Sequence, residues 1–118
     1  MDRQKLGRAG EEYAAKYLRK LGCIILERNF RCRYGEIDII ALDHGILCFI
    51  EVKTRSSLDF GMPCQAVDSR KERRIRRCAY VYMSRYQMED QEIRVDIIEV
   101  LFLHQRFYIR RLINGRKG

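Results

Sequence analysis

Residues 35–55 read GEIDIIALDHGILCFIEVKTR, and this stretch decides the fold because its charged residues stand inside otherwise apolar runs. Short runs rich in Ile, Val and Phe are typical of strands. We expect one strand over 35–40 and a second over 46–53, joined by a tight turn at 43–45. Gly45 tolerates the positive φ that such a turn needs, so the two strands should pair as an antiparallel hairpin.

Three charged side chains of this hairpin have the spacing of a metal-assisted phosphodiesterase site. Side chains alternate between the faces of a strand, so Glu51 and Lys53 share one side, and Asp38 on the preceding strand can face them. Neighbouring carboxylates repel each other unless a cation lies between them. Mg²⁺ prefers such oxygen ligands and keeps waters that can attack phosphorus. The alternative is structural, with Asp38 or Glu51 in a salt bridge to Lys53 or a nearby arginine.

The composition indicates one globular domain, residues 1–118, with a polyanionic partner. A chain of this length buries roughly two-thirds of its unfolded surface. The formal charge is +8, from 24 Lys and Arg against 16 Asp and Glu. We therefore expect a nucleic acid as the first partner class and an anionic membrane surface as the second. No apolar run approaches a membrane span, and the first residues lack the apolar segment of a secretory signal, so we expect a cytoplasmic protein.

The five cysteines are widely spaced and include no C-x-x-C pair, which argues against a zinc site and against a disulfide framework. Cys23, Cys48 and Cys78 lie in apolar patterns, so we expect them in the core. Cys32 and Cys64 fall in expected loops.

A first helix is expected over 3–21, where apolar residues recur at three- and four-residue steps and Gly22 gives a C-terminal stop. Gly7 and Gly10 are poor helix formers, which suggests that another part of the chain or a phosphate comes close to them. From its spacing alone, Glu11 is a solvated carboxylate favoured by the helix dipole rather than a third acidic group over the sheet.

A second helix, expected over 65–86, has a strongly basic side. Residues 70–77 contain six basic side chains against Glu72 alone, and like charges four residues apart repel each other. Phosphate groups would offset that repulsion, so we predict nucleic-acid contacts from this helix rather than an ordinary solvated face. The polar loop expected over 54–62 is a second place to hold a substrate. The predicted nucleic-acid contacts are Arg55, Arg70, Lys71, Arg74 and Arg77.

The remaining segments complete an α/β pattern. Further strands are expected over 23–29, 92–103 and 107–113, with a basic loop over 30–34 and a frayed tail over 114–118. The predicted order is α-β-β-β-α-β-β, in which a mixed central sheet is flanked by helices.

Five short motifs in this order resemble the YraN-like bacterial proteins, a family of uncharacterised function. They are GRAGE at 7–11, RNFR at 28–31, GEIDIIA at 35–41, EVKTR at 51–55 and FGMP at 60–63. The order of the elements also resembles the core of the PD-(D/E)XK nucleases, the restriction-endonuclease-like superfamily, and especially the archaeal Holliday-junction resolvases. Glu36 and Ile37 precede Asp38, so the proline that names the superfamily is absent.

By this resemblance Asp38 and Glu51 are metal ligands and Lys53 is the catalytic lysine. Glu11 matches the helix carboxylate that completes the site in resolvase-like nucleases. The resemblance implies nuclease chemistry, with Mg²⁺ or Mn²⁺ as the cofactor, but no identified substrate. It also implies a homodimer, because a junction offers two symmetric cuts.

We therefore predict a divalent-metal-dependent endonuclease that acts on DNA. Backbone contacts position a substrate without reading its sequence, and no base-reading element is evident, so selection of junctions, flaps or ends is expected. The same fold also hosts proteins that only bind. The alternatives are a nucleic-acid-binding module without turnover and, more weakly, a surface for an anionic membrane or a protein partner.

Overall fold

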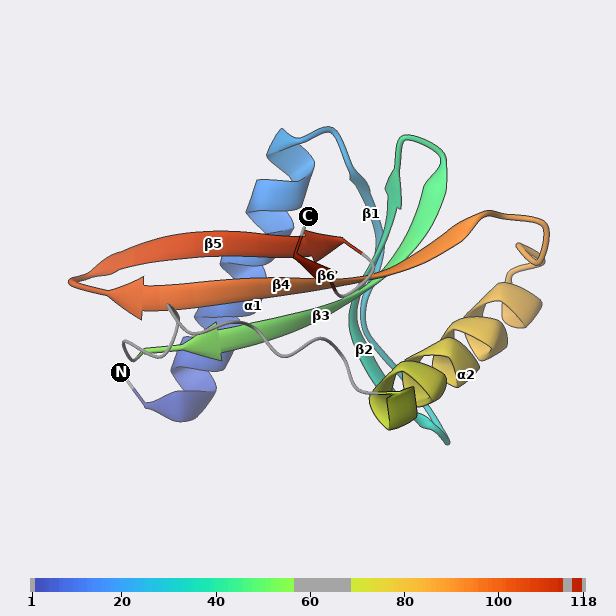
Figure 1. The fold of residues 1–118 in the computed structure, drawn as a ribbon, viewed down its shortest axis with the longest axis horizontal. Helices are drawn as coiled ribbons and strands as arrows, with labels where there is room; N and C mark the ends of the chain where they lie inside the picture. The colour runs from blue at the N-terminus through green and yellow to red at the C-terminus, as the bar shows by residue number, and fades with distance from the viewer. Residues whose placement is uncertain (1, 57–68, 114–115, 118) are drawn as a thin grey trace.

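The computed structural model describes residues 2–56, 69–113 and 116–117 of the chain (Figure 1). Among these residues the elements are α1 (Arg3–Lys20), β1 (Ile24–Cys32), β2 (Gly35–Asp43), β3 (Ile46–Arg55), α2 (Ser69–Arg85), β4 (Ile93–Leu103), β5 (Arg106–Ile113) and β6 (Arg116–Lys117). The predicted order of elements is confirmed. The expected frayed tail is wrong in part, because β6 pairs with the end of β5.

The described strands form one mixed sheet in the order β1-β2-β3-β4-β5-β6. Strands β1, β2 and β3 form an antiparallel meander, and β4 then lies parallel to β3. Parallel neighbours require a crossover connection, and the segment that contains α2 provides it. Strand β3 is thereby central, as its apolar sequence predicts.

The two helices cover opposite faces of the sheet (Figure 1). Leu47 and Phe49 of β3 pack in the cluster that contains α2 residues, whereas Cys48 and Ile50 pack in the cluster that contains α1 residues. All four side chains are fully buried. Burial on both faces explains why β3 is a nearly continuous apolar run until Glu51.

Some boundaries differ from the predicted ones. Strand β1 continues to Cys32 rather than ending at Asn29, because Phe30 is buried and its ring packs edge-on against α2, 5.3 Å between centroids from Tyr82. The expected basic loop is therefore mostly strand. Strand β3 continues to Arg55, which ends a strand instead of lying in a loop.

The expected loop over 54–62 and the start of the second helix fall mainly within residues 57–68, outside the described part of the chain. Neither described helix combines the length and the hydropathy that crossing a bilayer requires.

The cysteines predicted to be core residues, Cys23, Cys48 and Cys78, are buried. Cys32 is not in a loop, because the extended β1 places it at the strand end, where its Sγ lies 3.3 Å from Sγ of Cys78 on α2. Cys64 lies outside the described residues.

Gly10 of α1 is buried against the sheet. A Cβ atom on Gly10 would lie 2.1 Å from Oγ1 of Thr54 on β3, whereas a Cβ on Gly7 would meet nothing within 4 Å. The close approach predicted at the two glycines therefore occurs at Gly10. Because Glu11 follows directly, this contact fixes its position beside the sheet.

Candidate active site

The site opens where β2 and β3 separate. The last pair of their ladder is Ile39 with Ile50. Beyond this pair on β3, the Val52 N–H donates to Oδ2 of Asp38 at 2.8 Å. The side-chain carboxylate therefore accepts the hydrogen bond in place of a backbone carbonyl. Ile37 packs in the α2-side cluster although Ile39 packs in the α1-side cluster. The regular alternation of side chains along β2 is therefore interrupted at Asp38, where the pairing with β3 ends.

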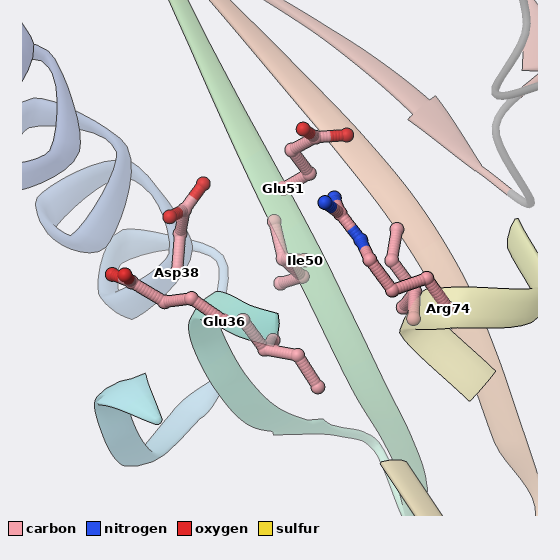
Figure 2. A pocket seen from close by; sticks show the side chains of 7 residues that line it. Glu36, Asp38, Ile50, Glu51 and Arg74 are labelled. Carbon is pink, nitrogen blue, oxygen red and sulfur yellow. The ribbon is translucent and has the colours of Figure 1, made fainter. Parts of the chain in front are cut away.

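A cavity of about 220 Å³ lies in this opening (Figure 2). Its polar lining comes from β2, β3 and α2, and consists of Glu36, Asp38, Glu51 and Arg74. Figure 2 shows Asp38 and Glu51 extending from neighbouring strands, with Arg74 reaching from α2 toward the Glu51 side. The structure thus brings together the two carboxylates that the sequence predicts as metal ligands.

Burial raises the pKa of Asp38 to about 6. The hydrogen bond from Val52 N–H lowers the pKa of Asp38, while the negative charges of Glu11, Glu51 and Glu36 raise it further. A carboxylate among three others in a half-buried opening favours a proton or another cation beside it. A bound cation, like a proton, would relieve this repulsion.

Glu51 has one partnered and one unpartnered oxygen. Its Oε1 lies 2.5 Å from Nζ of Lys71, which reaches over from α2. Its Oε2 is buried and has no hydrogen-bond partner among the described residues. The salt-bridge alternative is therefore met by Lys71, not by Lys53, and a second lone-pair position of the same carboxylate stays available to a cation.

Lys53 lies two residues beyond Glu51 on the same side of β3, half-buried and in register with Glu99 of β4. The lining of the 220 Å³ cavity ends at Glu51, so Lys53 lies beyond it. Glu99 is fully buried, and Arg110 Nε donates to its Oε1 at 2.7 Å. The sequence did not single out Glu99, whose pattern is that of an ordinary strand residue.

Glu11 faces the same group of carboxylates from α1. Burial is the main cause that raises the pKa of Glu11; Arg28 lowers that pKa and Glu36 raises it. With its amide oriented to donate, the Asn29 nitrogen lies 3.1 Å from Oε1 of Glu11 and 3.1 Å from Oε1 of Glu36. The Asn29 backbone has a positive φ of 55°, a conformation that asparagine adopts more readily than most residues.

Glu36 and Asn29 were not predicted as site residues. Both lie within motifs that carry the family resemblance, and those motifs were the available signal. Asn29 bridges Glu11 to Glu36, and Glu36 lines the cavity beside Asp38. The helix carboxylate is thus linked to the opening through these two residues.

In the part of the chain that the structure describes, no three His, Cys, Asp or Glu side chains are arranged to hold a metal ion by themselves. Mg²⁺ does not need such a cage, because it is usually bound by one or two carboxylates, several waters and substrate phosphates. Asp38 and Glu51 are two carboxylates that line one opening. Oε2 of Glu51 has no hydrogen-bond partner among the described residues, whereas the Lys71 ammonium beside Oε1 already neutralises part of the charge of this carboxylate.

The predicted basic residues divide between two places. Arg70, Arg74 and Arg77 line a second cavity of about 400 Å³, hereafter the basic cavity. Arg74 also lines the carboxylate opening, so the two cavities adjoin. Lys71 instead contacts Glu51, and Arg55 lies half-buried at the end of β3. Among the described residues, Tyr34 and Arg73 also line the basic cavity.

Sequence comparison places the chain among related proteins. The model of the uncharacterised protein family UPF0102 matches residues 10–100. The chain belongs to the UPF0102 family. A UPF0102 protein of Nocardia farcinica is 49% identical over 100 residues, which cover 85% of this chain and 79% of the relative. One of Dictyoglomus turgidum is 44% identical over 101 residues, 86% of each chain.

A UPF0102 protein of Caldanaerobacter subterraneus is similar over a greater length, 41% identical over 112 residues that cover 95% of this chain and 92% of the relative. The predicted family is therefore confirmed. The UPF0102 match includes the carboxylate opening and α2.

Proposed function

We propose that this UPF0102 protein is a divalent-metal-dependent endonuclease that acts on DNA. The observation that carries the proposal is the pair of carboxylates, Asp38 and Glu51, in an opening that adjoins the basic cavity through Arg74. A nuclease needs a cation site beside a phosphate site, and carboxylates that adjoin an arginine-lined cavity support this proposal.

In this proposal Asp38 and Glu51 hold Mg²⁺ or Mn²⁺, which when bound supplies an acidified water and stabilises charge on the phosphate. Lys53 stabilises the negative charge that develops during the reaction. Glu11, tied to Glu36 by Asn29, orients the acidic side of the opening. Arg74 binds a phosphate next to the reacting one, because its side chain lines both cavities.

The basic cavity favours a substrate held by its backbone. Its described polar groups are arginines and one tyrosine, which bind phosphates without distinguishing base pairs. Selection by DNA structure, at a junction, flap or end, follows more readily than recognition of a sequence. A homodimer would place two such sites on one symmetric junction.

The test is cleavage of branched, nicked, flapped and linear DNAs of related sequence in Mg²⁺ or Mn²⁺. The parent protein should cleave at least one structured DNA, and Glu51→Gln should abolish cleavage while DNA binding in a chelator persists. The control is Glu12→Gln, which changes an exposed carboxylate paired with Arg28. Absence of metal-dependent cleavage throughout the panel would contradict the proposal.

The second candidate is a nucleic-acid-binding module without turnover. The Lys71–Glu51 ion pair favours it, because that pair neutralises Glu51 without a metal. Under this alternative Mg²⁺ should not shift the melting temperature of the parent protein. Glu51→Gln would then leave Lys71 beside a neutral partner and lower stability with or without Mg²⁺, at a cost of roughly 3–5 kcal/mol if the pair behaves as a buried one.

A further inference from the structure

A third cavity, of about 550 Å³, lies between the β1–β2 turn and α2, on the far side of the basic cavity. We call it the aromatic cavity. Its described walls include two tyrosine rings and three arginines, namely Tyr34, Tyr80, Arg33, Arg76 and Arg77. The carboxylates of the active-site opening do not belong to it, so the nuclease proposal leaves it without a role.

The tyrosines of this cavity present ring surface to solvent and to cations. Tyr80 is a large aromatic residue on the exposed side of α2, and 65% of its surface is exposed. The guanidinium of Arg33 lies 4.9 Å from the Tyr34 ring centroid, and that of Arg77 lies 5.8 Å from it. Aromatic rings bordered by arginines are the surfaces on which unpaired bases stack in single-strand-binding proteins.

The three cavities follow one another along α2. Arg74 is shared by the carboxylate opening and the basic cavity. Tyr34 and Arg77 are shared by the basic and the aromatic cavity. A strand whose phosphates occupy the basic cavity therefore has the carboxylates at one end of its path and the two tyrosines at the other.

We infer that the aromatic cavity binds an unpaired nucleobase of a DNA strand whose phosphates lie in the basic cavity. A paired base is stacked inside the duplex and cannot enter such a cavity without being extruded. The inference rests on the proposed function and names its substrate class: duplex DNA that carries a single-stranded segment, such as a flap or a frayed end.

The test is the affinity for two DNAs in a chelator at fixed salt, measured by fluorescence anisotropy. One is a blunt duplex, and the other is the same duplex with a short single-stranded tail. The parent protein should bind the tailed DNA about tenfold more tightly, because the tail adds base stacking. Tyr80→Ala should remove that preference and leave blunt-duplex binding unchanged, whereas Tyr80→Phe should retain it.

The matched control is Tyr108→Ala, which removes another exposed tyrosine, on β5, and should leave both affinities unchanged. A fluorescent base analogue in the tail should change its emission with the parent protein and not with Tyr80→Ala. A free mononucleotide competitor at the tail's concentration should not displace the tailed DNA.

Equal affinities of the parent protein for the two DNAs would overturn the inference, as would a Tyr80→Ala variant that weakens both alike. Displacement of the tailed DNA by an equal concentration of mononucleotide would also overturn it, in favour of a nucleotide site. These measurements contain no metal, so they stand apart from cleavage. A nuclease without tail preference refutes only this inference, and a tail preference without cleavage refutes only the nuclease.

Discussion

Asp38 lines the opening, and burial there raises its pKa. Its pKa rises from 3.8 to about 6, so its contribution to stability is complete below about pH 4 and is lost as the pH rises through about 6. In metal-free buffer Asp38→Asn should therefore raise the free energy of unfolding near pH 7, by up to about 3 kcal/mol. Asparagine keeps an oxygen for the Val52 N–H. Urea unfolding at pH 7 and at about pH 4 measures the effect.

The gain from Asp38→Asn should vanish at about pH 4, where the parent side chain is already neutral in the folded protein. If Asp38→Asn and the parent protein differed equally in stability at the two pH values, the folded protein would not raise the pKa of Asp38. The matched control is Glu12→Gln, whose parent carboxylate is exposed and has its pKa lowered by Arg28. That substitution should give no gain at the higher pH.

Several partners of the site residues could not be predicted from the sequence. Asp38, Glu51 and Lys53 stand out because charge interrupts apolar strands, and the alternation of side chains predicts that Glu51 and Lys53 share one side. The contact of Lys71 with Glu51 depends on how α2 packs against β3. Likewise, Asn29 reaches Glu11 only through a backbone with positive φ, which nothing in its immediate sequence required.

At the scale of the elements, the packing of α1 on β3 depends on Gly10. Gly10→Ala should destabilise the protein by about 1–3 kcal/mol, because its Cβ would collide with Thr54 and push α1 from the sheet. Gly7→Ala should instead stabilise it by about 0.5–1 kcal/mol, since that position is open and alanine favours a helix. Thermal unfolding of the two variants measures both signs.

Thr54→Ala in the Gly10→Ala background should recover part of the loss, because two of the three colliding atoms are removed. If Gly10→Ala were as stable as the parent protein, α1 would not be seated at Gly10. The position of Glu11 beside the opening would then lose its structural basis.

The elements themselves were largely predictable, and the errors have a physical cause. Strand β1 was expected to end early because Arg31 and Arg33 give its last part a loop-like charge. Burial of Phe30 and partial burial of Cys32 show that the same residues alternate as a strand does. Basic side chains on the exposed face made this segment look like a loop, although its buried and exposed residues alternate as in a strand.

At the scale of the whole molecule, some arginines lie in ion pairs and others line a cavity, a distribution that the net charge does not reveal. Arg94 donates from Nε to Oδ1 of Asp96 at 2.9 Å. Arg111 of β5 forms ion pairs with Asp96 and with Asp43 of β2. Contacts between residues so distant in the chain could not be predicted from the sequence alone. These arginines lie in ion pairs, while Arg70, Arg73, Arg74 and Arg77 face one cavity.

The single-turnover rate at which Lys53→Met cleaves a flapped DNA in Mg²⁺ tests the nuclease account most directly. Methionine keeps an unbranched stem and removes only the ammonium. The account predicts that the rate falls about a hundredfold or more relative to the parent protein, while Mn²⁺ affinity, DNA affinity and melting temperature stay the same. The control, Lys16→Met on the exposed side of α1, should cleave at the parent rate. A Lys53→Met variant that cleaves as fast as the parent protein, or a parent protein that cleaves no DNA in Mg²⁺ or Mn²⁺, would contradict the account.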